Sequence, residues 1–128
     1  MHKSPYAVAV FIIAENATLL VKDLMKPAPQ YWKLPGGRSG KTENPENCAI
    51  RELQEEVGVK LSPEQLQRIY VERRPNHDLI IYRATLNKLP EWKTRGDGGE
   101  QVRVWKVDEL LDLPDLFPVH RRAIRQIL

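Results

Sequence analysis

The chain of 128 residues is 41% hydrophobic and 29% charged, with 20 lysines and arginines against 17 aspartates and glutamates. This length and composition predict one domain over residues 1–128 and exclude a disordered or low-complexity chain. The longest apolar run, residues 6–14, has about half of the roughly 18 residues that a membrane-spanning helix needs, so we expect no membrane segment.

The same run is the first predicted element. Its β-branched residues predict a buried strand over residues 6–13, Glu15-Asn16 predicts a turn, and residues 18–22 form the returning strand of a hairpin. The run has no small-x-small cleavage site, which argues against a signal peptide. Because Cys48 is the single cysteine and cannot form an internal disulfide, we expect a cytoplasmic protein.

Prolines and glycines define the next segment. Pro27 and Pro29 predict a surface loop over residues 23–30, after which residues 31–34 form a short extended piece. Pro35-Gly36-Gly37 predicts a sharp turn that ends this piece and lets the backbone come close to a ligand.

A helix is predicted over residues 45–57. Asn44 suits the N-cap position, Pro45 suits the first helical position, and Gly58 suits the C-terminal cap. At 100° per residue, one arc of the helix holds three carboxylates, and the aliphatic residues take the opposite face. The carboxylates are Glu52, Glu55 and Glu56, and the aliphatic residues are Ile50, Leu53 and Val57.

The second half of the chain predicts three more strands and a terminal helix. Strands are expected over residues 66–71, 79–86 and 102–107, a helical turn over residues 108–111, and an amphipathic helix over residues 118–128. A glycine-rich loop, residues 94–100, precedes the last of these strands. Strands and helices therefore share one chain, as in the α/β class.

Charge is segregated along the sequence. Between Glu43 and Glu56 there are five acids and one base, a net charge of −4, whereas the remaining residues carry +7. An acidic island in a basic chain is typical of a metal site that serves a phosphate-bearing substrate, and a solvated helix face is the alternative. Three carboxylates in one arc repel one another unless a cation shares their site. We therefore expect a hard divalent ion, Mg²⁺ or in its place Mn²⁺.

Residues beside this arc are candidates for orienting the carboxylates and binding the substrate. The planar guanidinium of Arg51 can hold a carboxylate through two hydrogen bonds, and Glu43 is the candidate partner. Lys33 or Arg38, which flank the glycine pair, is expected to meet a substrate phosphate. Trp32 is a candidate for stacking on a nucleobase.

Residues 37–59 match the pattern G-x5-E-x7-R-E-U-x-E-E-x-G-U, in which U is a bulky aliphatic residue. The fixed positions are Gly37, Glu43, Arg51, Glu52, Glu55, Glu56 and Gly58, and the aliphatic positions are Leu53 and Val59. This motif is the Nudix box, and by it the chain resembles the Nudix hydrolase family and its MutT-like members. The resemblance implies a single-domain α/β/α sandwich with a mixed β-sheet.

The resemblance also implies which residues hold the metal. The carbonyl oxygen of Gly36 and the carboxylates of Glu55 and Glu56 would be ligands. Glu52 would either assist as a ligand or serve as the general base.

Further residues are implied around this metal. Arg51 and Glu43 would orient the catalytic carboxylate, and Glu100 lies where some family members place an additional glutamate. The implied reaction is attack of a metal-polarised water on a phosphorus of a nucleoside diphosphate that is linked to another group.

Two features favour different substrates. Pro75 lies 16 residues beyond Val59, a spacing that accompanies ADP-ribose hydrolysis in the family, whereas the chain length resembles that of MutT-type nucleoside triphosphate hydrolases. A non-catalytic module that binds or senses nucleotides is the alternative function, although the box carboxylates are intact. His77 is either a pH-sensitive substrate contact or a loop residue without a specific role.

Nucleic acid is a less favoured partner. An RNA-binding or decapping protein is a third alternative, suggested by the isoelectric point near 9.1. However, Arg121, Arg122 and Arg125 on the terminal helix are typical of a solvated face. The sequence does not determine the number of subunits.

Overall fold

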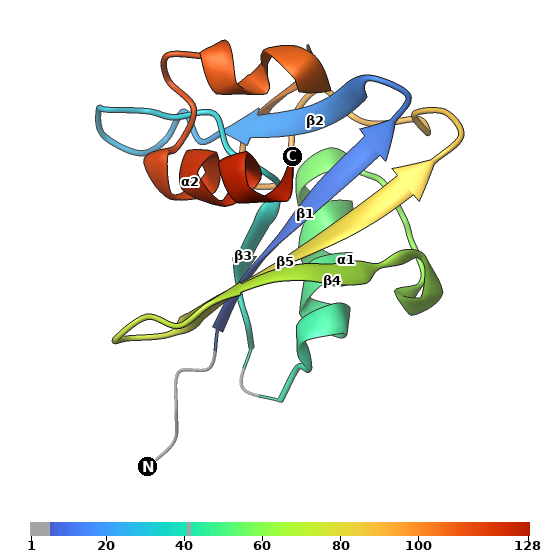
Figure 1. The fold of residues 1–128 in the computed structure, drawn as a ribbon, viewed down its shortest axis with the longest axis vertical. Coiled ribbons are helices and arrows are strands. Elements are labelled where there is room, and N and C mark those ends of the chain that lie inside the picture. Colours follow the sequence, from blue (N-terminus) through green and yellow to red (C-terminus); the bar gives the residue numbers. More distant parts are fainter. Residues whose placement is uncertain (1–5, 41) are drawn as a thin grey trace.

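Within residues 6–40 and 42–128, which the computed structural model describes, the chain forms six strands, two α-helices and two short 3₁₀ helices (Figure 1). The strands are β1 (Tyr6–Ala14), β2 (Ala17–Lys22), β3 (Gly36–Arg38), β4 (Gln67–Glu72), β5 (Asp78–Leu86) and β6 (Gln101–Lys106). The helices are α1 (Pro45–Val57), α2 (Pro118–Ile127) and the 3₁₀ helices Pro63–Gln65 and Val107–Asp112. Lys41, a variable position of the box, lies outside the described residues.

Strand β1 organises a mixed sheet. It runs parallel to β5 along its whole length and forms the predicted hairpin with β2 through Ala14 and Ala17. The strand order is β4-β5-β1-β2-β6, and β3 pairs with the N-terminal half of β1 outside this path. The parallel β1–β5 pair, beside antiparallel pairs, confirms the predicted mixed sheet.

Different helices cover the two faces of the sheet (Figure 1). Val10 of β1 belongs to a buried cluster with Leu53 of α1, whereas its neighbour Phe11 belongs to a second cluster with Ile124 of α2. Successive residues of a strand point to opposite faces, so this alternation builds the α/β/α layers. In the part of the chain that the structure describes, no helix is long and apolar enough to cross a membrane.

The ends of α1 confirm the prediction from its capping residues. The side chain of Asn44 accepts a hydrogen bond of 2.8 Å from the backbone N–H of Asn47. At the other end, Gly58 has a φ of 75° and donates its N–H to the carbonyl of Gln54 over 3.0 Å. A left-handed residue of this kind favours glycine, so the helix begins and ends at fixed positions.

The predicted turn at Gly36 and Gly37 is wrong, because these glycines form strand β3 with Arg38. Gly36 pairs with Ala9, and a Cβ atom on Gly36 would lie 2.0 Å from the carbonyl oxygen of Val8. Glycine is therefore needed here for the close approach of two backbones, and not for a turn conformation.

Candidate active site

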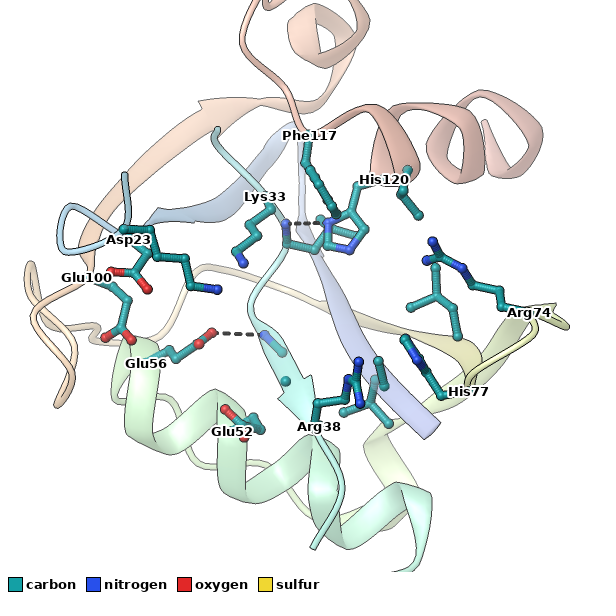
Figure 2. Close-up of a pocket in the computed structure, with 18 residues that line it drawn as sticks. Asp23, Lys33, Arg38, Glu52, Glu56, Arg74, His77, Glu100, Phe117 and His120 are labelled. Carbon is teal, nitrogen blue, oxygen red and sulfur yellow. Dashed lines mark hydrogen bonds between the residues drawn. The ribbon is translucent and has the colours of Figure 1, made fainter. Parts of the chain in front are cut away.

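A cleft of about 530 Å³ lies between α1, β3 and the loops that follow β2 and β4. Figure 2 shows the carboxylates of Glu52, Glu56 and Glu100 at one end of the cleft, with Asp23 next to Glu100. Arg74 and His77 lie at the other end. The cleft thus joins an acidic end to a basic end.

Helix α1 supplies two of the three carboxylates. Glu52 and Glu56 are one helical turn apart and line the cleft together. The backbone N–H of Gly36 donates a hydrogen bond of 2.9 Å to Glu56 Oε1. Burial, with the nearby carboxylates of Glu52 and Glu100, nevertheless raises the pKa of Glu56 to about 8. Glu56 is thus a partly buried acid whose ionised form lacks sufficient compensation.

Glycine makes room for Glu52. A Cβ atom on Gly37 would lie 2.5 Å from the Glu52 carboxylate, so a side chain at this position would displace that carboxylate. Burial raises the pKa of Glu52, while the charge of Arg51 opposes this shift. The fixed glycine of the box therefore serves the carboxylate that faces it.

The loop before β6 brings Glu100 to the same end of the cleft. Two carbonyl groups at the C-terminal end of α1 accept backbone N–H groups from this region, Glu55 from Asp97 and Val57 from Lys93, both over 2.9 Å. These contacts satisfy helix carbonyls that have no partner inside the helix. The loop is thereby tied to α1, and Glu100 lines the cleft with Glu56.

Arg51 compensates the negative charge of the carboxylates on the other side of α1. It donates to both carboxylate oxygens of Glu43, with Nη2 2.9 Å from Oε1, as the sequence predicted. This pairing, with an N–H from Gly40, lowers the pKa of Glu43 to about 2. Arg51 Nη1 lies 3.1 Å from Glu55 Oε1 and 3.3 Å from Glu52 Oε2. One guanidinium thus contacts three carboxylates of the box.

The three carboxylates of the predicted arc do not share one pocket. Glu55 lines a separate surface pocket with Arg51, Lys93 and Asp97. It does not line the cleft that holds Glu52 and Glu56. The structure therefore brings together Gly36, Glu52, Glu56 and Glu100 and places Glu55 beside Arg51.

The predicted substrate residues also separate. Lys33 and Arg38 line the cleft (Figure 2). Trp32 does not, since its side chain is 5% exposed and packs edge-on against Trp105 with ring centroids 5.7 Å apart. Lys22 also lies over the Trp32 ring, at 4.8 Å from its centroid. The structure thus places Trp32 in the core instead of the cleft.

Sequence reasoning missed two residues that reach the cleft from the start of α2, Phe117 at its N-cap and His120 in its first turn. Phe117 lies under the ammonium group of Lys33, which is 5.8 Å from the ring centroid. His120 is buried, and its Nδ1 accepts a hydrogen bond of 3.1 Å from the N–H of Leu34. Burial lowers the pKa of His120 to about 3, so the ring is neutral. No motif marks these residues, because they join the cleft only through the tertiary fold.

The donor atoms of the acidic end suit a hard divalent cation. Within residues 6–40 and 42–128, no group of three acidic, histidine or cysteine side chains converges closely enough to form a complete metal site. However, the acidic side chains at this end offer carboxylate oxygens, which are the ligand atoms that such cations prefer. The raised pKa of Glu56 also indicates a carboxylate that a cation would stabilise. Mg²⁺ commonly binds one or two carboxylates and completes its shell with water and substrate phosphates.

Known proteins are similar to this chain both in sequence and in fold. Diphosphoinositol polyphosphate phosphohydrolase 2 from Homo sapiens is 28% identical over 115 residues, which cover 88% of this chain and 63% of the relative. This chain thus spans less than two thirds of the length of that relative.

Two solved structures show the same fold. A MutT structure from work on Aliivibrio salmonicida and Vibrio cholerae has a TM-score of 0.79 at 20% identity, covering 95% of this chain and 94% of that one. A bifunctional NMN adenylyltransferase/ADP ribose pyrophosphatase from Francisella tularensis, in complex with AMP and a manganese ion, has a TM-score of 0.79 at 22% identity. The match covers 98% of this chain and 41% of the Francisella tularensis protein. The model of the NUDIX domain matches residues 3–127, and the chain therefore belongs to the NUDIX domain family.

Proposed function

We propose that the protein is a pyrophosphohydrolase that depends on a divalent metal, with Mg²⁺ as the natural ion and Mn²⁺ as a substitute. The observation that carries this proposal is Glu56, a partly buried carboxylate that has no ion-pair partner within residues 6–40 and 42–128 and faces a cleft rich in cationic side chains. The charge of Lys33 acts on Glu56 but leaves its pKa raised, and a carboxylate still undercompensated in a cationic cleft fits a metal bound together with phosphate groups.

The chain's own residues would divide the metal site between them. Glu56, Glu52 and the carbonyl oxygen of Gly36 would be ligands, with Glu100 beside them. A bound divalent ion would polarise the attacking water and neutralise charge on the phosphates. Glu55, which the motif also implies as a ligand, contacts Arg51 and is the ligand that we expect to contribute least.

Hydrolysis then needs a base and a means of holding the substrate. Glu52 would accept the proton of the attacking water, whose oxygen forms a bond to one phosphorus while the bridging P–O bond breaks and its electron pair stays on the departing phosphate. Lys33, whose charge acts on Glu56, would hold the scissile diphosphate. Arg51 and Glu43 would keep Glu52 in place.

The substrate class follows from the same cleft and from the relatives. We propose a diphosphate that links a nucleoside to another group, as in nucleoside triphosphates or ADP-ribose. The relative from Homo sapiens, named for diphosphoinositol polyphosphates, adds that class to the substrates that need testing. The single cysteine of the chain accords with the cytoplasm as its compartment.

The proposal is tested by measuring phosphate or nucleotide release with Mg²⁺. The substrates are nucleoside triphosphates, ADP-ribose, dinucleoside polyphosphates and a diphosphoinositol polyphosphate. We expect turnover of at least one of them, and a loss of kcat of about 10²–10⁴-fold in Glu52→Gln and Glu56→Gln. Glu64→Gln, an exposed carboxylate outside the cleft, is the matched control and retains activity.

Two outcomes would contradict the proposal. Nucleotide binding without turnover of any substrate would favour the sensing module. Turnover that survives chelation of divalent ions would exclude the metal.

A smaller loss of activity in Glu55→Gln than in Glu56→Gln is expected, because Glu55 lies outside the cleft.

A further inference from the structure

The basic end of the cleft contains side chains that the proposed hydrolysis does not use. Arg38 comes from β3, whereas Arg74 and His77 come from the loop between β4 and β5 (Figure 2). All three line the cleft that holds Glu52 and Glu56, and Figure 2 shows them away from those carboxylates. The sequence analysis left His77 as either a pH-sensitive substrate contact or a loop residue without a specific role.

Arg74 lacks a full partner for its guanidinium. Its Nε lies 3.8 Å from Glu72 Oε2, too far for a hydrogen bond. Glu72 is already bound more closely, by Arg122 Nη2 at 2.9 Å and by the hydroxyl of Tyr70 at 2.8 Å. Within residues 6–40 and 42–128, the side chains of Arg38 and Arg74 donate no hydrogen bond. Both therefore keep their donors for a ligand.

His77 provides a second and independent observation. Its Nδ1 atom is buried and has no hydrogen-bond partner among the described residues. Burial, together with the charges of Arg38 and Arg74, holds the pKa of His77 below its usual value. The charges of Arg38 and Arg74 thus act on the same imidazole, and an anion bound among the three side chains would offset those two positive charges.

We propose that Arg38, Arg74 and His77 form a phosphate subsite at the end of the cleft opposite Glu56. The preferred substrate then carries at least one phosphate beyond the diphosphate that is cleaved, either at the end of a linear polyphosphate or on a phosphorylated polyol. Two guanidinium groups suit such a phosphate, because arginine binds phosphate oxygens with paired donors. ADP-ribose, which has a neutral ribose beyond its diphosphate, is disfavoured. The substrate preference rests on the proposed function, because it concerns the bond that is cleaved. The binding of an anion by the three side chains does not depend on that function.

The first test compares substrates in matched variants. Arg74→Ala is expected to lower kcat/KM for ATP or for a diphosphoinositol polyphosphate by about tenfold, mostly through KM, and to change it less than about twofold for ADP-ribose. Arg73→Ala is the control, since Arg73 is exposed on the same loop and does not line the cleft. Asn76→Ala is the corresponding control for His77→Ala.

The substrate that responds identifies the source of the extra phosphate. Loss confined to ATP indicates a linear polyphosphate, and loss confined to the inositol compound indicates a phosphorylated ring. Either result supports the subsite. Equal losses with ADP-ribose, or equal losses in Arg73→Ala and Arg74→Ala, would overturn it.

The second test does not require turnover. Inorganic tripolyphosphate is titrated into the metal-free protein by calorimetry, and we expect Arg74→Ala to weaken binding by about tenfold while Arg73→Ala binds as the wild type does. Tripolyphosphate binding that depends on Arg74 in a protein without hydrolase activity would leave the subsite standing and remove the proposed function. If hydrolysis depends on Glu56 but Arg74→Ala binds tripolyphosphate and reacts as the wild type does, the proposed function would stand and the phosphate subsite would be excluded.

Discussion

Two carboxylates on opposite sides of helix α1 are in opposite electrostatic states, Glu43 in the loop before the helix and Glu56 on the helix itself. Arg51 binds Glu43 through both carboxylate oxygens and holds its pKa at about 2. On the cleft side, burial raises the pKa of Glu56 to about 8. One half of the motif is thus compensated within the chain, whereas the other half needs positive charge from a ligand. A single sequence motif can therefore contain a structural part and a reactive part.

The largest expected effects come from neutralising one carboxylate on each side. Glu56→Gln lowers kcat by about 10²–10⁴-fold, while the metal-free protein is as stable as the wild type or more stable, because glutamine needs no protonation to occupy this partly buried position. Glu43→Gln lowers the free energy of unfolding by roughly 1 kcal/mol, because Arg51 loses its paired acceptor at a partly exposed site.

Urea unfolding in chelator, together with kcat in Mg²⁺, separates these two responses. A Glu56→Gln protein that loses as much stability in chelator as Glu43→Gln does would show that both sides of α1 are structural. The distinction between the two halves of the motif would then be lost.

The glycines of β3 give the next largest effects. A Cβ atom on Gly36 would lie 2.0 Å from the carbonyl oxygen of Val8, so Gly36→Ala is expected to destabilise the protein by about 1–3 kcal/mol. On Gly37 the Cβ atom would meet the Glu52 carboxylate at 2.5 Å, so Gly37→Ala should lower kcat more than it lowers stability. Thermal unfolding and initial rates, measured on the same samples, check both expectations.

Gly40 supplies the control on the compensated side. A Cβ atom there would lie 3.4 Å from Glu43 Oε1, an ordinary contact, so Gly40→Ala should change neither stability nor kcat appreciably. If Gly40→Ala were as inactive as Gly37→Ala, the effect of Gly37 could not be assigned to Glu52.

The dependence of stability on pH sharpens the comparison further. The folded-state pKa of Glu56, about 8, lies above its ordinary value of 4.5, so the stability that Glu56 contributes is lost as pH rises from about 5 to 8. The pKa of Glu43, about 2, lies below that value, so the contribution of Glu43 is present above pH 4.5 and is lost as pH falls. Unfolding free energies in chelator are measured for the wild type, Glu56→Gln and Glu43→Gln. The slope between pH 5 and 8 should weaken in Glu56→Gln alone.

The compensated side was the more predictable from the sequence. Helix α1 is fixed by local signals, namely Asn44, Pro45 and Gly58, and the structure has the predicted bounds Pro45–Val57. The pairing of Arg51 with Glu43 also followed, because a planar guanidinium beside a loop carboxylate has few other partners. Both predictions depend on residues that are close in the sequence.

The cleft side depends on contacts between distant segments, which no local pattern reveals. Helical spacing placed Glu55 in the same arc as Glu56, but the contact with Arg51 lies outside the cleft. Trp32, beside Lys33, was a candidate for stacking on a nucleobase, but its packing against Trp105 places it in the core. The basic end, with Arg74, depends on where the sheet places the β4–β5 loop relative to α1 and β3.

The smallest expected effect comes from a change at the N-terminus of α1, whose N-cap stabilises the whole helix and therefore both of its sides. Asn44 accepts the N–H of Asn47, and Asn44→Ala leaves this donor without its partner, which costs about 1 kcal/mol of stability. Asn44→Asp retains an acceptor oxygen and should be close to the wild type. Because both sides of the helix share this cap, kcat at saturating Mg²⁺ should change less than about twofold in the folded protein. A tenfold loss of kcat in Asn44→Ala under conditions where it is fully folded would mean that the start of α1 positions the cleft carboxylates directly. The boundary between the structural and reactive parts of the motif would then lie elsewhere.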